Sequence, residues 1–370
     1  MATNSTTSKH ESNDHVNLQA PPPTPSNHHD HHDSFSTSTQ LSFILNQILI
    51  PPLKPILSSP SPTISFLLPN HKTKLSLLST VTRHPFFHLK DLHIHIPSHL
   101  PPSSLLESKS LLPSKNFSSL CFNKDKDEDE DDENDEAKSL LVLEPTSIDP
   151  NTLPSLHEFT QCLQRVAMEV LEMLFDGMLD HEGAPTPRFL IWISKPKEKK
   201  DELEMEMVQM EMERRRNVKC YPYVMCMQYE MRGRGRTSWV VGDSGELVSI
   251  PSRADSLLVT LGDIAQVWSN GRFKKVRGIP FQSSSSNHDY NGDQSFISLT
   301  FMVTLPLEST ISPLLPLKIK DDNNNGGEEE DDDDGWKRFT PFLMVDYAWK
   351  VYHERFTEKD PLIRYRVPEV

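Results

Sequence analysis

One segment, residues 256–280, constrains the fold of this chain more than any other. Its apolar residues fall into three groups separated by short turns, at 256–261, 264–268 and 272–276. Asn270 and Gly271 lie between the last two groups, and Asn-Gly suits the positive φ angles of a tight hairpin turn. The segment therefore predicts three consecutive strands of an antiparallel sheet, with a Gly262-Asp263 turn after the first.

Other periodic segments extend this sheet and add a helix. Strands are predicted at 188–192, 221–231, 237–241, 246–250 and 295–306, and a strand with a turn at 84–97. The clearest helix is 155–183, where apolar residues recur at three- and four-residue steps. Ser155 and Glu158 have the spacing of a capping box at its start, and Gly183 supplies a stop. We expect His93 and His95 to lie on one exposed strand face rather than to bind metal.

The acidity of the chain is local. The formal net charge of the 370 residues is −15, but 125–136 and 321–334 hold 10 and 9 acidic residues. Without these 19 carboxylates the rest of the chain carries +4, which argues against nucleic acid as the main partner. The 30 prolines and 13 glycines indicate that a sizeable fraction of the chain is unpacked.

Composition divides the chain into four parts. These are a Pro- and His-rich disordered tail at 1–38, a helix and strand support region at 39–196 with an acidic loop at 123–138, a charged insertion at 197–216, and a β-rich domain at 217–370 with a second acidic loop at 321–334. The histidines at 28, 29, 31 and 32 fit a tail better than a metal site, because no core surrounds them.

The sequence favours a reduced, intracellular setting. The four cysteines show no CxxC spacing, which fits neither a disulfide framework nor a zinc site. The amino terminus lacks the pattern of a secretory signal, and no apolar run approaches the ~20 residues of a membrane helix. We expect a cytoplasmic protein with no membrane partner, the nucleus being the alternative.

The segment LLVTLGDIAQVWSNGRFKKV at 257–276 resembles the hairpin region of plant Fe(II)/2-oxoglutarate-dependent dioxygenases, the isopenicillin N synthase-like superfamily. The resemblance covers roughly 72–122, 150–196 and 217–368. It implies a mainly β fold with flanking helices, in which a double-stranded β-helix, or jelly roll, at 217–370 is supported by the amino-terminal helices.

The residues that do chemistry in that family are not kept here. The family's His-X-Asp pair aligns with Asn217 and Lys219, and its distal His aligns with Gly278. An ammonium group opposes a bound cation, and glycine has no donor side chain. The Arg-X-Ser that grips 2-oxoglutarate appears as Phe296 and Ser298. Ser298 is therefore the one cofactor-contacting position that matches, with Arg277 expected beside the same pocket.

The resemblance and its gaps predict a divergent oxygenase-like protein that has lost its iron, with no catalytic residue and no expected cofactor. Its role would be regulatory, or the binding of a small anionic or apolar ligand. The alternative is an active oxidoreductase on a small plant metabolite, with Fe(II) and 2-oxoglutarate held at a site rebuilt from other residues. A second alternative is a scaffold that binds a protein partner through the charged insertions.

Overall fold

The computed structural model describes residues 57–58, 61–111, 140–179, 185–194, 221–230, 236–284, 297–315, 338–353 and 360–368. All of them belong to one compact unit, Leu53–Val370. The predicted tail at 1–38, both acidic loops and the insertion at 197–216 lie outside the described residues. No helix in the described ranges is long and apolar enough to cross a membrane.

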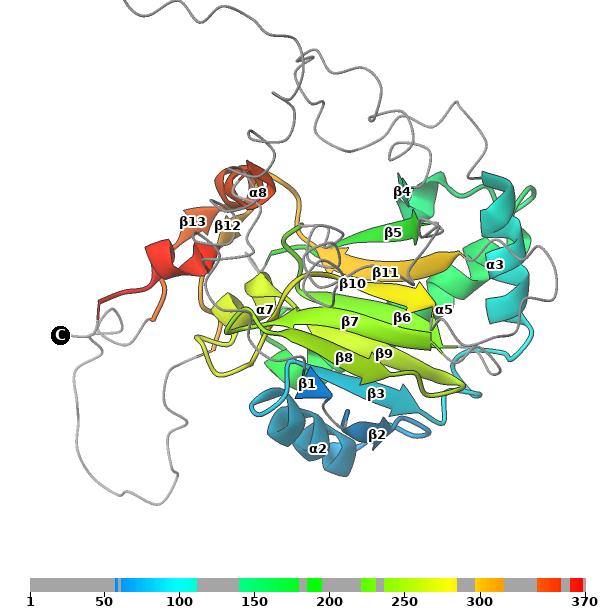
Figure 1. The fold of residues 1–370 in the computed structure, drawn as a ribbon, viewed down its shortest axis with the longest axis horizontal. Coiled ribbons are helices and arrows are strands. Elements are labelled where there is room, and N and C mark those ends of the chain that lie inside the picture. Colours follow the sequence, from blue (N-terminus) through cyan, green and yellow to red (C-terminus); the bar gives the residue numbers. More distant parts are fainter. Residues whose placement is uncertain are drawn as a thin grey trace, which may run out of the picture. The chain divides into compact units, whose positions relative to one another are not determined.

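Two sheets form the centre of this unit (Figure 1). The large sheet has the order β2-β3-β9-β6-β11-β5-β4, and the small sheet has the order β1-β8-β7-β10. The strands of the large sheet are β2 (Thr63–Ser65), β3 (Phe86–Lys90), β4 (Leu140–Leu143), β5 (Arg188–Ser194), β6 (Met225–Glu230), β9 (Ser256–Leu261) and β11 (Ser298–Thr304). Those of the small sheet are β1 (Leu57–Ser58), β7 (Arg236–Gly242), β8 (Leu247–Pro251) and β10 (Val276–Ser284). These strands confirm the predicted mainly β class.

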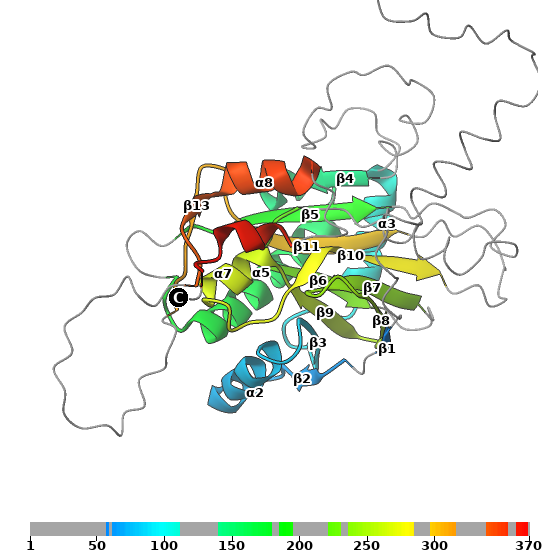
Figure 2. The same ribbon diagram turned by 60° about the vertical axis from the view of Figure 1, so that its left-hand side comes forward.

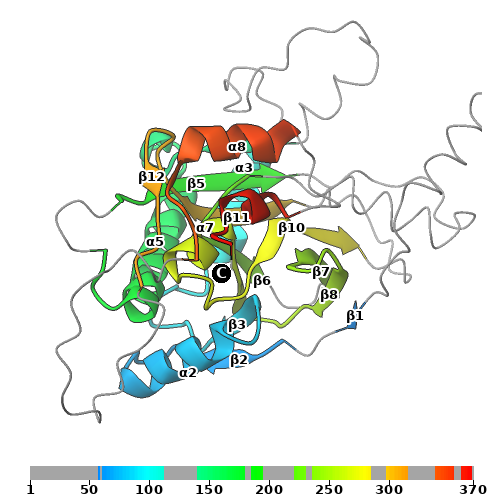
Figure 3. The same cartoon turned by 90° about the vertical axis from the view of Figure 1, so that its left-hand side faces the viewer.

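Side-chain alternation gives the large sheet two buried faces. In β11, Phe301 and Val303 pack into the core that contains helix α5 (Pro154–Phe175), whereas Met302 packs toward the small sheet. Val240 of β7 and Val248 of β8 meet Met302 in one cluster, so the two sheets face each other. Figure 3 shows α5 on one side of the large sheet and β7 and β8 on the other. Successive strand residues point to opposite faces, which explains the split.

Three further helices and four short elements, besides α7, complete the described fold. Helix α2 (His71–Val81) lies beside β2 and β3 (Figure 2), and α3 (Leu100–Leu111) packs on α5. Helix α8 (Met344–His353) follows β13 (Phe342–Leu343), which pairs with β12 (Thr310–Ile311). The 3-10 turns η1 (Pro145–Ser147) and η3 (Pro361–Tyr365) are the remaining elements, apart from α7, which is described below.

The predicted long helix is confirmed, but both of its ends differ from the prediction. Helix α5 begins at Pro154 and makes no side-chain cap of its own, so the predicted capping box of Ser155 and Glu158 is wrong. It ends at Phe175, where Asp176 adopts φ 52°, before the predicted stop at Gly183, which lies outside the described residues.

Glu107 of helix α3 caps α5 instead. Its Oε1 accepts from the Ser155 amide at 3.1 Å and its Oε2 from the Leu156 amide at 2.8 Å. The first amides of a helix have no partner within it, and a carboxylate there also suits the helix dipole. A cap that comes from another helix leaves no signal in the sequence beside α5.

Replacing Glu107 by alanine is expected to lower the free energy of unfolding by about 1–2 kcal/mol, the upper range for a lost helix cap. Ser155→Ala is the matched control, since its side chain caps nothing, and should change stability by less than about 0.5 kcal/mol. Urea denaturation followed by circular dichroism measures both. Equal losses in the two variants would show that Glu107 does not act as a cap.

The segment 264–268 was predicted as a strand and is helix α7 (Asp263–Trp268). The segment 272–276 is not a strand until Val276, where β10 begins. The Asn-Gly turn does have positive φ at both residues, 54° and 78°, but it joins a helix to a loop. All six residues of α7 are buried, so the burial that suggested a strand equally suits a short buried helix.

Close packing requires a glycine at position 262, where the chain enters α7. A Cβ atom on Gly262 would lie 2.4 Å from the carbonyl oxygen of Tyr223.

The prediction that His93 and His95 lie on a strand face is wrong, because both lie in turns after β3. His95 Nδ1 lies 3.9 Å from a carboxylate oxygen of Glu169 on α5, a tertiary contact that alternation cannot reveal.

Candidate functional site

The space between the two sheets is lined mostly by apolar side chains. Residues of the large sheet and of the small sheet form one buried cluster, made of Phe86, Val142, Leu190, Trp192, Tyr223, Cys226, Val240, Val248, Ile250, Leu258, Val276, Ile279 and Met302. Burial raises the pKa of the Cys226 thiol well above its ordinary value. This cysteine is therefore protonated at neutral pH, because its apolar surroundings favour the neutral thiol.

Two polar side chains cross this interior to β10. The Tyr223 hydroxyl donates to the Gly278 carbonyl at 2.9 Å, and Gln228 Nε2 donates to the Pro280 carbonyl at 2.9 Å. Gln228 Nε2 also donates to Thr300 Oγ1 at 2.7 Å. Both donors come from the β6 region, so they tie the two sheets together through main-chain carbonyls.

Gly278 lies at an irregularity of β10. The β10–β7 register shifts between Arg277 and Phe281, and Gly278 has φ 72°. A side chain in that conformation costs roughly 1–2 kcal/mol. The position therefore has no donor side chain, a backbone that disfavours one, and a carbonyl already bound to Tyr223.

The other predicted site residues divide into described and undescribed ones. Asn217, Lys219 and Phe296 lie outside the described residues. Ser298 is buried, and strand alternation places it on the same face of β11 as Thr300 and Met302, toward the small sheet. Within the described ranges, no group of three or more His, Cys, Asp and Glu side chains could hold a metal ion.

Arg277 does not lie beside Ser298, contrary to the expected shared pocket. Its register partner is Val241, which packs with Trp239 and Leu247 on the other face of the small sheet. Residues paired directly across two strands share a face. Alternation along β7 and β10 thus places Arg277 on the face away from the interior that Ser298 faces.

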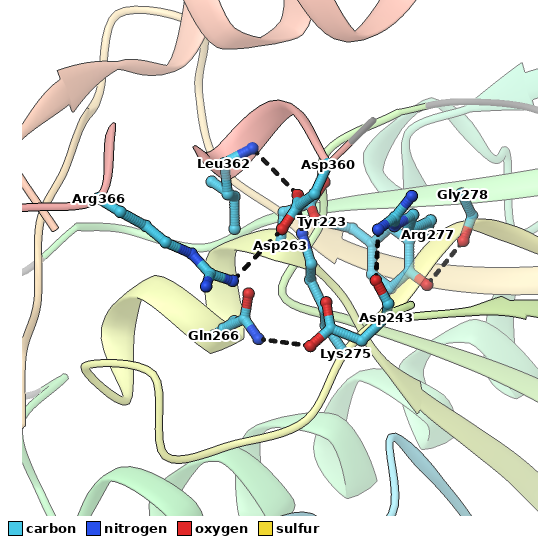
Figure 4. Close-up of polar contacts among 10 residues, drawn as sticks. All are labelled: Tyr223, Asp243, Asp263, Gln266, Lys275, Arg277, Gly278, Asp360, Leu362 and Arg366. Atoms are coloured by element: carbon cyan, nitrogen blue, oxygen red, sulfur yellow. Dashed lines mark hydrogen bonds and ion pairs between the residues drawn. The ribbon is translucent and has the colours of Figure 1, made fainter. Parts of the chain in front are cut away.

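A buried ion-pair network lies beside Arg277 (Figure 4). The Lys275 side chain is fully buried, and its Nζ lies 2.6 Å from Asp263 Oδ1 and 2.6 Å from Asp360 Oδ1. The Leu362 amide also donates to Asp360 Oδ1 at 3.0 Å, and Arg366 Nη2 lies 3.5 Å from Asp360 Oδ2. One lysine thus joins helix α7 and the segment before β10 to the carboxy-terminal turn η3.

The electrostatics of Asp360 follow from this arrangement. Burial alone would raise the pKa of its carboxyl group, but the charge and hydrogen bond of Lys275, with smaller help from the Leu362 amide and Arg277, lower it below the ordinary value. Asp360 is therefore ionised at neutral pH although it is buried. Its ionised form depends on the cation beside it.

Sequence reasoning missed this network and the role of His88. Lys275 and Asp360 are far apart in the chain, and no motif links them. His88 is fully buried on β3, with Nδ1 2.7 Å from Ser61 Oγ, and pairs with Leu258 on the face toward the small sheet. His88 differs from the other histidines of 84–95 in being fully buried, which the sequence does not show.

Comparison with known proteins identifies the fold. No protein-family model and no curated protein sequence matches the chain. Among solved structures, it is similar to the dioxygenase for auxin oxidation of rice, with 14% identity, a TM-score of 0.50, and coverage of 83% of this chain and 100% of that one. It is also similar to JOX2 in complex with 2OG, Fe and JA, with 13% identity, a TM-score of 0.55, and coverage of 85% and 93%. The chain therefore has the jelly-roll fold of 2-oxoglutarate/Fe(II) oxygenases.

Proposed function

We propose that this protein is a divergent, catalytically degenerate member of the 2-oxoglutarate/Fe(II) oxygenase superfamily that has kept the jelly roll as a small-ligand-binding, regulatory module. The observation that carries the proposal is the state of Gly278, which aligns with the family's distal histidine. It offers no side chain, and its carbonyl accepts the Tyr223 hydroxyl at 2.9 Å.

The backbone supports the same conclusion as the missing side chain. A histidine at 278 would have to adopt φ near 72°, which is strained for a residue with a side chain, or straighten β10, which would disturb the contact of the 278 carbonyl with Tyr223. Iron in this fold needs two imidazoles and a carboxylate around one point. The described residues supply no such set.

The alternative, an active oxygenase, requires a site rebuilt from other residues. His88 is the one buried histidine on the interior face of the large sheet among the described residues, and it is engaged with Ser61. A rebuilt site would have to combine His88 with residues outside the described ranges. This makes His88 the variant that separates the two functions.

The test is metal and turnover analysis of protein purified without a histidine tag and reconstituted anaerobically with Fe(II). We expect far less than one iron per chain and no 2-oxoglutarate-dependent release of succinate, with an active oxygenase of the same fold as positive control. Stoichiometric iron together with succinate release would overturn the proposal. If His88→Ala then abolished both, His88 would be identified as part of a rebuilt site.

A further inference from the structure

Arg277 is a buried cation with a single hydrogen bond among the described residues. Its side chain belongs to a residue that is only 8% exposed, and its Nη2 donates to the main-chain carbonyl of Asp243. Nε and Nη1 are buried and have no hydrogen-bond partner in the part of the chain that the structure describes. None of the ion pairs among the described residues involves Arg277.

Such a group requires a partner. An arginine cannot release its proton in a protein, so burial cannot be relieved by neutralisation. Buried polar groups are nearly always hydrogen-bonded, and the exceptions indicate an unseen ligand, ion or water. The neighbouring Lys275 is satisfied by two carboxylates, whereas Arg277 has only a carbonyl oxygen.

The free donors of Arg277 match a carboxylate. Nη2 carries two protons, and the contact with Asp243 uses one of them. If it uses the proton on the Nε side, Nη1 and Nη2 still present two parallel N–H groups. If the contact uses the other Nη2 proton, Nε and Nη2 present the two parallel N–H groups instead. One complete edge of the guanidinium is therefore free in either case, and such an edge binds both oxygens of a carboxylate.

Two unpartnered acceptors lie in the same cluster, which we call the Arg277 cluster and which consists of Asp243, Gln266 and Arg277 (Figure 4). Gln266 Nε2 donates to Asp243 Oδ2 at 3.3 Å, while Asp243 Oδ1 and Gln266 Oε1 are buried without a partner. The main-chain carbonyl of Asp243 accepts a hydrogen bond from the guanidinium of Arg277. The unpartnered Oδ1 belongs to the side chain of the same residue, close to the unbonded edge of the guanidinium. A ligand donor beside the carboxylate would satisfy these oxygens.

We propose that the Arg277 cluster binds a small monocarboxylic acid that carries a hydroxyl or amino donor next to its carboxylate. The carboxylate pairs with the free edge of Arg277, and the donor with the acceptor oxygens of Asp243 and Gln266. The inference rests on the proposed binding function, for which it names the ligand class. The cluster lies on the face of β10 away from Ser298, so its geometry does not depend on the presence or absence of iron.

Calorimetry and thermal-shift measurements with four probes at equal ionic strength test this inference. The probes are lactate, alanine, propionate and propionamide, which share a carbon skeleton and differ in the donor and in the charge. We expect lactate or alanine to bind more tightly than propionate, and propionamide, which has no carboxylate, to produce no shift. Arg277→Lys replaces the two parallel N–H donors of the guanidinium with a single ammonium group, and should raise the Kd of the carboxylate probes by at least about tenfold.

Two variants keep the test decisive. Arg277→Met should fold at least as well as the natural chain without ligand, because it removes an unpaired buried charge, and should show no ligand-induced shift. Asp243→Asn keeps the main-chain carbonyl and should reduce the preference for lactate or alanine over propionate. Equal shifts in the natural chain and in Arg277→Met, or no shift with any carboxylate, would overturn the inference and leave water as the partner of Arg277. Iron analysis of the same samples reports separately on the proposed loss of catalysis.

Discussion

Replacing Lys275 by methionine is expected to lower the free energy of unfolding by about 3–5 kcal/mol at neutral pH, the loss typical when one partner of a buried ion pair is removed. Methionine is close to lysine in length and fills most of its volume, so little of the effect comes from a cavity. The loss arises because Asp263 and Asp360, both nearly buried, would face each other without the cation that lies 2.6 Å from each.

The pH dependence of this variant gives the sharper signature. In the natural chain the pKa of Asp360 is lowered, so its contribution to stability is present above the unfolded pKa of about 3.9 and is lost as pH falls through the lower folded value. Without Lys275, burial and the second carboxylate favour protonation of the pair. The stability difference between the two proteins should therefore be largest at neutral pH and should shrink toward pH 4. Urea denaturation at a series of pH values measures it.

Arg366→Met is the matched control for Lys275→Met. The Arg366 side chain is 49% exposed and lies 3.5 Å from Asp360, so its removal should cost less than about 1 kcal/mol. A further variant, Lys275→Met with Asp263→Asn and Asp360→Asn, should recover part of the lost stability, since no buried charge remains. A pH-independent loss in Lys275→Met, with no recovery in the further variant, would show that packing and not charge explains the effect.

The sequence contained enough information for the sheets because strand alternation is local. In β8, Val248 and Ile250 pack toward the large sheet and Ser249 between them lies on the other face, and such an alternation of apolar and polar residues can be recognised without a structure. The resemblance at 257–276 likewise indicated the jelly roll. It did not give the helical state of α7, because six consecutive buried residues carry no period that separates a short strand from a short helix.

The candidate site was less predictable because it depends on contacts between distant residues. The cap of α5 by Glu107, the pairing of Lys275 with Asp360, and the unpartnered nitrogens of Arg277 all depend on tertiary structure. The separation of Arg277 from Ser298 depends on the face of the small sheet that Arg277 occupies, and its pairing with Val241 fixes that face. That Gly278 has no donor side chain, in contrast, can be read directly from the sequence.

Trp268 should be the most sensitive single position in α7, and we expect Trp268→Ala to lower the free energy of unfolding by about 3–5 kcal/mol. Its ring is fully buried and packs edge-on against Phe175 at the end of α5, with ring centroids 5.4 Å apart. Phe175 in turn contacts Phe273 at 5.6 Å. The alanine variant would open a cavity where α5, α7 and the loop before β10 meet.

Trp268→Phe and Trp349→Ala are the controls for Trp268→Ala. They show whether its loss of stability comes from the cavity or from removing any tryptophan. Trp268 Nε1 is buried without a hydrogen-bond partner, so phenylalanine removes an unsatisfied group while keeping an aromatic ring, and should cost less than about 1.5 kcal/mol. Trp349 is 52% exposed on α8, and its replacement by alanine should cost less than Trp268→Phe. Chemical denaturation ranks the three, and equal losses at Trp268 and Trp349 would contradict the role assigned to burial.

The Trp268→Ala variant also tests whether α7 couples the core to the polar groups beside it. Asp263 and Gln266 lie on the same short helix and contact Lys275 and Asp243, respectively. A displaced α7 would weaken both contacts, so the losses of Trp268→Ala and Lys275→Met should add up to more than the loss measured in the double variant. A fully additive double variant would mean that α7 holds Asp263 in place beside Lys275 without Trp268.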